Sequence, residues 1–298
     1  MMRSRWVALQ EGAVKVIFFA CAAVSLATTA GIVGILAWES FTFFRHVSVW
    51  EFLAGTEWAP NFDPRKFGVL PLVCGTFMIG GGALALALPV GLGSALFLSE
   101  YAHASLRAVL KPILELLAGI PSVVYGFFAI HFVTPYVLQP LIPGTEIFNA
   151  ASAAIVVGVM IIPTIASVSD DALRAVPRSL REAAYAVSAT PLEVSTRVVL
   201  PAAMSGVVAA VLLAFARAIG ETMAVALAAG QTPKLTLNPF ESIHTLTGSI
   251  VQMSLGDTPA GSIEYQTIFA VGLTLFLITF VFNYAGQRVL TRFREVYE

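Results

Sequence analysis

Charged residues are scarce in this 298-residue sequence, at 12% against about 25% in a typical soluble domain. So few charges cannot cover a water-soluble particle of this size, and the 57% of hydrophobic residues excludes a disordered chain. A net charge of −1 argues against nucleic-acid binding, because phosphate backbones are bound by basic surfaces. The composition therefore predicts an integral membrane protein surrounded by lipid.

Cysteine and histidine are also scarce, with 2 and 4 residues. Cys21 and Cys74 lie in apolar runs, which predicts two buried side chains and neither a disulfide framework nor a zinc site. The sequence contains no HExxH, GxSxG or P-loop motif. We therefore expect no catalytic centre and no metal or other cofactor bound by this chain, and any ATP hydrolysis must occur on another subunit.

Six stretches are apolar and long enough to cross a bilayer, which takes about 20 residues. They cover 13–38, 69–98, 110–138, 148–168, 202–229 and 266–287. The first run is too long for a signal peptide and is expected to remain as a helix. The sequence therefore predicts an all-α polytopic membrane protein with six transmembrane helices, forming one membrane domain over residues 1–298.

The distribution of Lys and Arg predicts the orientation. With the N-terminus in the cytoplasm, 12 basic residues, from Arg3 to Arg294, fall in cytoplasmic segments and 4 fall outside. The remaining one, Arg217, lies within a membrane run. This asymmetry predicts that both termini are cytoplasmic, and it places the long charged loop over 169–201 in the cytoplasm.

Two helix-start signals occur in that loop. Ser179 followed by Glu182 fits a capping box, and Thr190, Pro191 and Glu193 form a second start signal. They predict two short helices that meet near residues 188–190.

The first of these short helices carries small side chains, Ala183 and Ala184, that would allow another surface to approach it closely. The pattern leaves two interpretations open: an amphipathic connector on the membrane surface, or a docking element for a partner protein.

Two charges, Arg217 and Glu221, lie inside the fifth apolar run. Each costs about 2.5–3.5 kcal/mol at the centre of a membrane helix, and such residues usually face a partner or a cavity. At i, i+4 spacing they would be neighbours on one helix face. They could form an ion pair that tightens packing. Alternatively, Arg217 could bind an oxyanion in transit, with Glu221 holding it while the path is empty.

The third apolar run is interrupted by Pro121, which cannot continue the hydrogen bonding of a helix. The interruption is either a packing kink or part of a ligand site, since broken membrane helices often border such sites. In the second case, Ser122 and Tyr125 are candidate pathway residues.

Glu182-Ala183-Ala184, followed by Leu200-Pro201, resembles the EAA loop of ABC importer permeases. The resemblance implies that this loop is the coupling helix that docks on a cytoplasmic ATPase, through Glu182, Ala183, Ala184, Ser188, Thr190 and Pro191. The family pattern has Gly where this chain has Ser188. If the backbone there is left-handed, Ser costs about 1 kcal/mol more than Gly.

Three further strings add specificity. RAIGETMAV over 217–225 and ELLAGIPSVVYGF over 115–127 are similar to the C-type permease of the phosphate-specific (Pst) ABC importer. LSEYA over 98–102 matches permeases more broadly, and the resemblance extends over about 67–290. It implies the type-1 ABC importer permease fold and a transport subunit rather than an enzyme. In that family, the residues matching Arg217 and Glu221 are implicated in phosphate translocation.

The same resemblance implies a bacterial inner-membrane complex. Its expected partners are a second permease (PstA-like), an ATPase homodimer (PstB-like) that uses ATP and Mg, an extracytoplasmic phosphate-binding protein (PstS-like) and a PhoU-like regulator. Two alternatives stay open: an ABC permease for another oxyanion, such as sulfate or molybdate, and an ion-driven secondary transporter.

Overall fold

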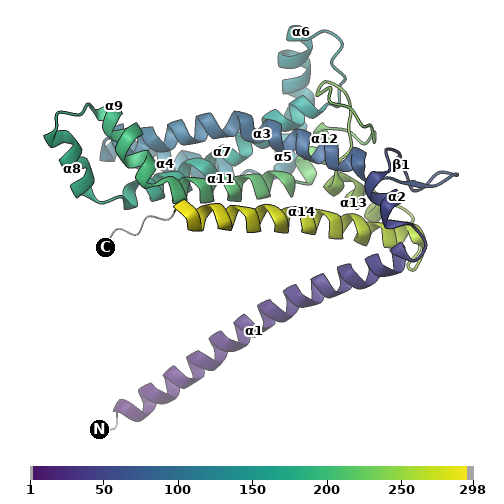
Figure 1. The fold of residues 1–298 in the computed structure, drawn as a ribbon, viewed down its shortest axis with the longest axis horizontal. Coiled ribbons are helices and arrows are strands. Elements are labelled where there is room, and N and C mark those ends of the chain that lie inside the picture. Colours follow the sequence, from purple (N-terminus) through teal and green to yellow (C-terminus); the bar gives the residue numbers. More distant parts are fainter. Residues whose placement is uncertain (1–2, 294–298) are drawn as a thin grey trace.

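The computed structural model describes residues 3–293, which form a bundle of long helices with one short β-hairpin (Figure 1). Residues 1–2 and 294–298, including Arg294 and the two ends of the predicted domain, lie outside the described residues. The longer helices are α1 (Arg3–Phe44), α3 (Leu70–Leu96), α4 (Ala104–Gly119), α7 (Ala150–Ala175), α11 (Met204–Ile219), α13 (Leu246–Leu255) and α14 (Ile263–Phe293).

Shorter elements connect them. The short helices are α2 (Val49–Ala54), α5 (Ser122–Phe128), α6 (Gln139–Leu141), α8 (Arg178–Ala186), α9 (Pro191–Glu193), α10 (Leu200–Ala202) and α12 (Met223–Ala228). Three π-helical segments continue neighbouring helices, namely η1 (Phe97–Tyr101), η2 (Ala129–Leu138) and η3 (Val194–Val199). The antiparallel hairpin pairs β1 (Trp58–Ala59) with β2 (Lys66–Phe67).

Five helical stretches are long and apolar enough to cross a membrane: Gln10–Phe44, Leu70–Tyr101, Ser122–Leu141, Ala150–Ala175 and Ile263–Arg288. A sixth is obtained when Pro191–Ala202 and Met204–Ile219, which meet at a bend of 73°, are counted as one span. The predicted all-α fold with six spans is confirmed in this sense. The start of α1 and the end of α14 lie at the same end of the molecule as α8, which we call the α8 end (Figure 1).

The third span begins later than the sequence predicted. Residues 104–119 form the separate helix α4, none of whose side chains is buried, and the span starts at Ser122. The chain is extended at Ile120 and Pro121, so the helix cannot run through them. Ion pairs hold α4 against the end of α7, because Arg107 binds the buried Asp170 and Lys111 binds Asp171 at 3.0 Å.

The fifth apolar run is broken as well, so the prediction of one helix over 202–229 is wrong. Helix α11 ends at Ile219, and α12 starts only at Met223. Gly220, a weak helix former, lies at the end of α11, and the Thr222 hydroxyl donates a hydrogen bond to its carbonyl at 3.2 Å. This break decides where the charged residues of the run point.

Helices α3 and α7 form the centre of the bundle and approach each other closely. A Cβ atom added at Gly91 would lie 2.8 Å from the Ile165 side chain, so only glycine allows this separation without a shift. At the start of α7, the Asn149 side chain accepts a hydrogen bond from the Ser152 N–H at 2.7 Å.

Helix α1 diverges from the rest of the bundle (Figure 1). It packs against α14, and its most apolar stretch has no buried residue. Cys21 on this helix is exposed and Cys74 on α3 is only partly buried, so the prediction of two buried cysteines is wrong. An apolar sequence run indicates burial in lipid or in a partner as well as burial within the chain.

His244, between α12 and α13, is 2% exposed, and neither ring nitrogen has a hydrogen-bond partner among the described residues. Burial lowers the pKa of His244 to about 4, although the Gly248 backbone opposes this effect. Because the unfolded chain binds this proton near pH 6.5, folding stability should fall as the pH drops from about 6.5 to 4, by about 3 kcal/mol.

Thermal unfolding of the purified protein, followed by intrinsic fluorescence, checks this expectation. His244→Phe should remove that part of the pH dependence, whereas His103→Phe, at an exposed histidine, should retain it. An unchanged pH profile in His244→Phe would refute the assignment.

Candidate functional site

Arg217 lies in the last turn of α11, and its side chain is exposed in this chain. Its Nη1 atom donates a long hydrogen bond of 3.4 Å to the Thr164 hydroxyl on α7. Thr164 lies 14 residues into the 26-residue α7, so the guanidinium is near the middle of a membrane-spanning helix. The structure thus presents a charge at mid-depth on an open face.

Glu221 does not neutralise Arg217, contrary to the prediction that the two side chains lie together on one helix face. The Glu221 carboxylate accepts a hydrogen bond from the Ala224 N–H at 3.2 Å, at the start of α12. Its backbone carbonyl accepts one from the Thr247 hydroxyl at 2.9 Å. The i, i+4 geometry is lost because α11 ends between the two residues, and within residues 3–293 no carboxylate forms an ion pair with Arg217.

The two broken spans meet beside Arg217. A Cβ atom added at Gly126 of α5 would lie 2.9 Å from Leu227 of α12, so the two short helices are in close contact. Tyr125, the residue before Gly126, is buried.

Tyr125 also stabilises the break in the third span. Its hydroxyl donates a hydrogen bond of 2.8 Å to the Leu117 carbonyl, which connects α5 back to α4. Ser122, the other candidate, is the half-buried first residue of α5. The hydrogen bond gives Tyr125 a role in the kink, and the part of both residues in a pathway stays a prediction.

The second candidate region is the loop that carries α8 and α9. The predicted capping box at Ser179 and Glu182 is wrong, because α8 starts directly after Pro177 and Ser179 already lies inside it. The second start signal is confirmed: the Thr190 hydroxyl accepts from the Glu193 N–H at 3.4 Å, and the Glu193 carboxylate accepts from the Thr190 N–H at 3.0 Å.

Ser188 has a φ of 62°, the one non-glycine residue with positive φ in the described part of the chain. The backbone at Ser188 is therefore left-handed, which is the case in which Ser costs more than the Gly of the family pattern. Because this conformation is strained for a residue with a Cβ atom, Ser188→Gly should raise the free energy of unfolding by about 1 kcal/mol. Ser179→Gly, inside α8, should lower it by about the same amount, and thermal unfolding of both variants tests the pair.

Arg181 fastens α8 to the rest of the molecule. Its guanidinium binds the Glu100 carboxylate through two hydrogen bonds, of 2.9 and 3.2 Å, and donates to the carbonyls of Leu173 and Val176. Such bidentate pairs are geometrically specific. The sequence alone indicated no role for Arg181 or for Glu100, although Glu100 lies in the LSEYA string over 98–102.

The outer side of α8 is open. Glu182 and Ala183 are exposed, as are the apolar side chains of Val187 (80% exposed) and Leu192 (64%). Helices α8 and α9 project at one end of the bundle (Figure 1). The loop therefore offers a mixed polar and apolar surface that is rigidly attached to the membrane helices.

The fold is that of a polytopic membrane protein with two broken spans beside an arginine. A loop fixed by Arg181 projects at one end of it. The chain belongs to the family of binding-protein-dependent transport system inner membrane components, whose family model matches residues 87–295. It is a multi-pass inner-membrane permease subunit of an ABC importer, a transport component rather than an enzyme, that works with an ATPase and a binding protein.

Curated relatives cover most of the chain. The "Probable ABC transporter permease protein YqgH" of Bacillus subtilis is 38% identical over 92% of this chain and 89% of its own length. The phosphate transport system permease protein PstC of Mesorhizobium japonicum is 32% identical, over 86% and 81%. That of Haemophilus influenzae is 30% identical, over 94% and 90%.

Solved structures share the fold. An inward-facing MetNI methionine ABC transporter chain has a TM-score of 0.57 at 21% identity, covering 76% of this chain and 95% of that one. A chain of a bacterial ABC transporter that imports alginate has a TM-score of 0.56 at 13% identity, covering 90% and 98%. These similarities confirm the predicted permease fold, and the family sets aside the ion-driven secondary transporter.

Proposed function

We propose that this permease imports inorganic phosphate, with Arg217 engaging the anion in transit. The observation that carries the proposal is the Arg217 guanidinium, exposed at mid-depth with one long hydrogen bond and no carboxylate partner among the described residues. A guanidinium stays charged at any relevant pH, and its planar donors match the oxygens of phosphate. Relatives named as phosphate permeases support this substrate.

Glu221 has a different role in this proposal from the one first expected. Bound to the start of α12, it stabilises the break between α11 and α12 rather than pairing with Arg217. Ser122 and Tyr125 border the neighbouring break on α5. The anion would therefore pass where two interrupted helices meet, and a single arginine would bind it weakly enough for release.

The proposed complex has this chain as half of the pathway and a PstA-like permease as the other half. A PstS-like protein delivers phosphate from outside, a PstB-like ATPase pair binds ATP and Mg beneath α8, and a PhoU-like protein regulates the complex. This chain itself binds no cofactor. The α8 end is then cytoplasmic, as are both termini, in agreement with the excess of Lys and Arg in those segments.

Uptake of radiolabelled phosphate by proteoliposomes containing the complete importer tests the substrate. Excess unlabelled phosphate should compete fully, whereas sulfate and molybdate at the same concentration should reduce uptake by less than about twofold. Such specificity is a difference between the affinities of one site for the competing anions. Competition by sulfate or molybdate equal to that by phosphate would favour an importer of another oxyanion.

A further inference from the structure

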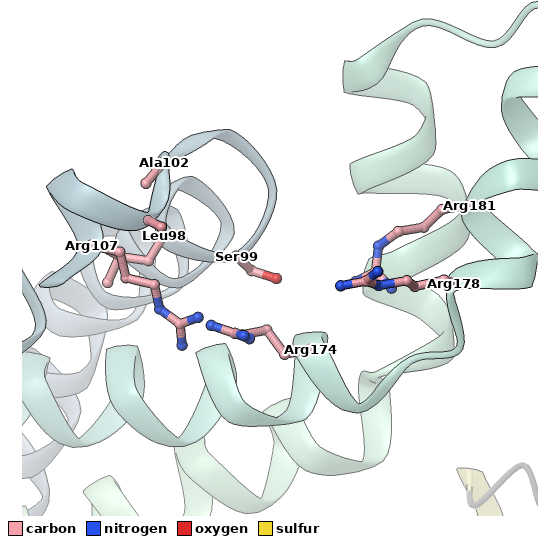
Figure 2. A pocket seen from close by; sticks show the side chains of 8 residues that line it. Leu98, Ser99, Ala102, Arg107, Arg174, Arg178 and Arg181 are labelled. Atoms are coloured by element: carbon pink, nitrogen blue, oxygen red, sulfur yellow. The ribbon is translucent and has the colours of Figure 1, made fainter.

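Four arginines line one cavity of about 330 Å³ at the α8 end. They come from three helices: Arg107 from α4, Arg174 from the last turn of α7, and Arg178 and Arg181 from α8. Figure 2 shows the guanidinium groups of Arg107 and Arg174 on one side of Ser99 and those of Arg178 and Arg181 on the other. The cavity is remote from Arg217 in the fold, because it lies at the end of the bundle rather than at mid-depth.

Two of these arginines are already neutralised. Arg107 binds the buried carboxylate of Asp170, and Arg181 binds Glu100. Each side chain is mostly buried, with 16% and 18% exposed. These pairs hold two walls of the cavity in fixed positions, so the cavity does not depend on mobile surface side chains.

The other two arginines carry uncompensated charge. Arg174 and Arg178 are exposed, and within the described part of the chain neither forms a hydrogen bond or an ion pair. Two guanidinium groups facing one cavity repel each other, and an anion between them would relieve that repulsion. Guanidinium groups bind phosphate through paired, charge-assisted hydrogen bonds.

We propose that this cavity binds a phosphate group, carried either by free inorganic phosphate or by an anionic phospholipid. Both sources are chemically equivalent at the guanidinium groups, and basic pockets between helices at the cytoplasmic membrane surface suit lipid headgroups. The phosphate group would bridge Arg174 on α7 and Arg178 on α8. These residues flank the extended joint at Val176 and Pro177, so the bound group would restrain the movement of α8 relative to α7.

The experiment uses the complex of the two permeases and the ATPase pair in detergent, without the phosphate-binding protein. Arg217→Gln is present throughout so that the pathway arginine does not contribute. Equilibrium dialysis measures binding of radiolabelled inorganic phosphate. Native mass spectrometry counts retained phosphatidylglycerol against phosphatidylcholine. R174Q/R178Q removes the two unpaired charges, and R197Q/R288Q is the matched control, removing two charges outside the cavity.

R174Q/R178Q should weaken binding of one probe by about tenfold or more, as expected for the loss of charge-assisted contacts. R197Q/R288Q should change the binding of either probe by less than about threefold. Loss of phosphate binding identifies the free anion as the ligand, and loss of phosphatidylglycerol identifies the lipid. Equal binding of both probes by all variants would overturn the proposal. The proposal would also be overturned if R174Q/R178Q still bound both probes but no longer copurified with the ATPase. That result would indicate that the cavity binds an acidic side chain of a partner protein.

Discussion

Arg217→Gln is expected to abolish phosphate uptake while the importer still assembles. Glutamine removes the positive charge and the paired donors, and each hydrogen bond to a charged group contributes about 1.5–3 kcal/mol, so engagement of the anion should weaken by about 10- to 100-fold. The fold should tolerate the change, because Arg217 is exposed and has one long hydrogen bond. Initial rates of radiolabelled phosphate uptake in proteoliposomes measure the effect.

Two matched variants separate charge from position. Thr164→Val removes the hydrogen-bond partner of Arg217 but leaves its charge, so uptake should fall by only a few-fold. Arg217→Lys retains the charge without the planar fork and should give an intermediate rate. Wild-type uptake by Arg217→Gln, with normal copurification of the partner subunits, would remove Arg217 from the pathway.

Glu182→Lys is expected to uncouple ATP hydrolysis from transport or to prevent ATPase binding. Glu182 is exposed on α8 and forms no hydrogen bond or ion pair among the described residues, so the substitution should leave the loop folded. Its charge is free to meet a partner, and reversing a charge within an interface costs several kcal/mol. Phosphate transported per ATP hydrolysed should therefore fall by about tenfold or more.

The control for this variant is Glu115→Lys, which makes the same charge change on the exposed surface of α4. It should leave the ratio of transport to hydrolysis near the wild-type value. If Glu182→Lys and Glu115→Lys behave alike, or if Glu182→Lys transports normally, α8 is not the coupling element.

Hydropathy predicted how many stretches are long and apolar enough to span a membrane far better than where the helices end. The fifth run was predicted as one helix, because a run of apolar residues continues across Gly220. The break at Pro121 in the third run was predicted, but the separate helix α4 before it was not. The helix ends depend on local backbone conformation: extended at Ile120 and Pro121, and interrupted by a turn over Gly220 and Thr222.

In the loop that carries α8 and α9, the sequence likewise indicated the helices better than their exact ends. The family pattern has Gly at the position of Ser188, which raised a left-handed conformation there as one case, and the structure shows that conformation. The cap at Ser179 was not predicted correctly, because Pro177 sets the start of α8 two residues earlier. A capping motif indicates that a helix starts nearby, but the preceding backbone decides which residue occupies the first position.

By itself, the sequence determined that this chain is a membrane protein, which segments are apolar enough to span, and which motifs identify its family, since these depend on composition and local strings. Only the tertiary structure decided which charges have partners. Arg181 binds Glu100 from 81 positions away, and Arg217 lacks the carboxylate four residues ahead. Arg174 and Arg178 have no ion-pair partner within residues 3–293. Helix ends and helix packing set these distances, and neither follows from spacing along the chain.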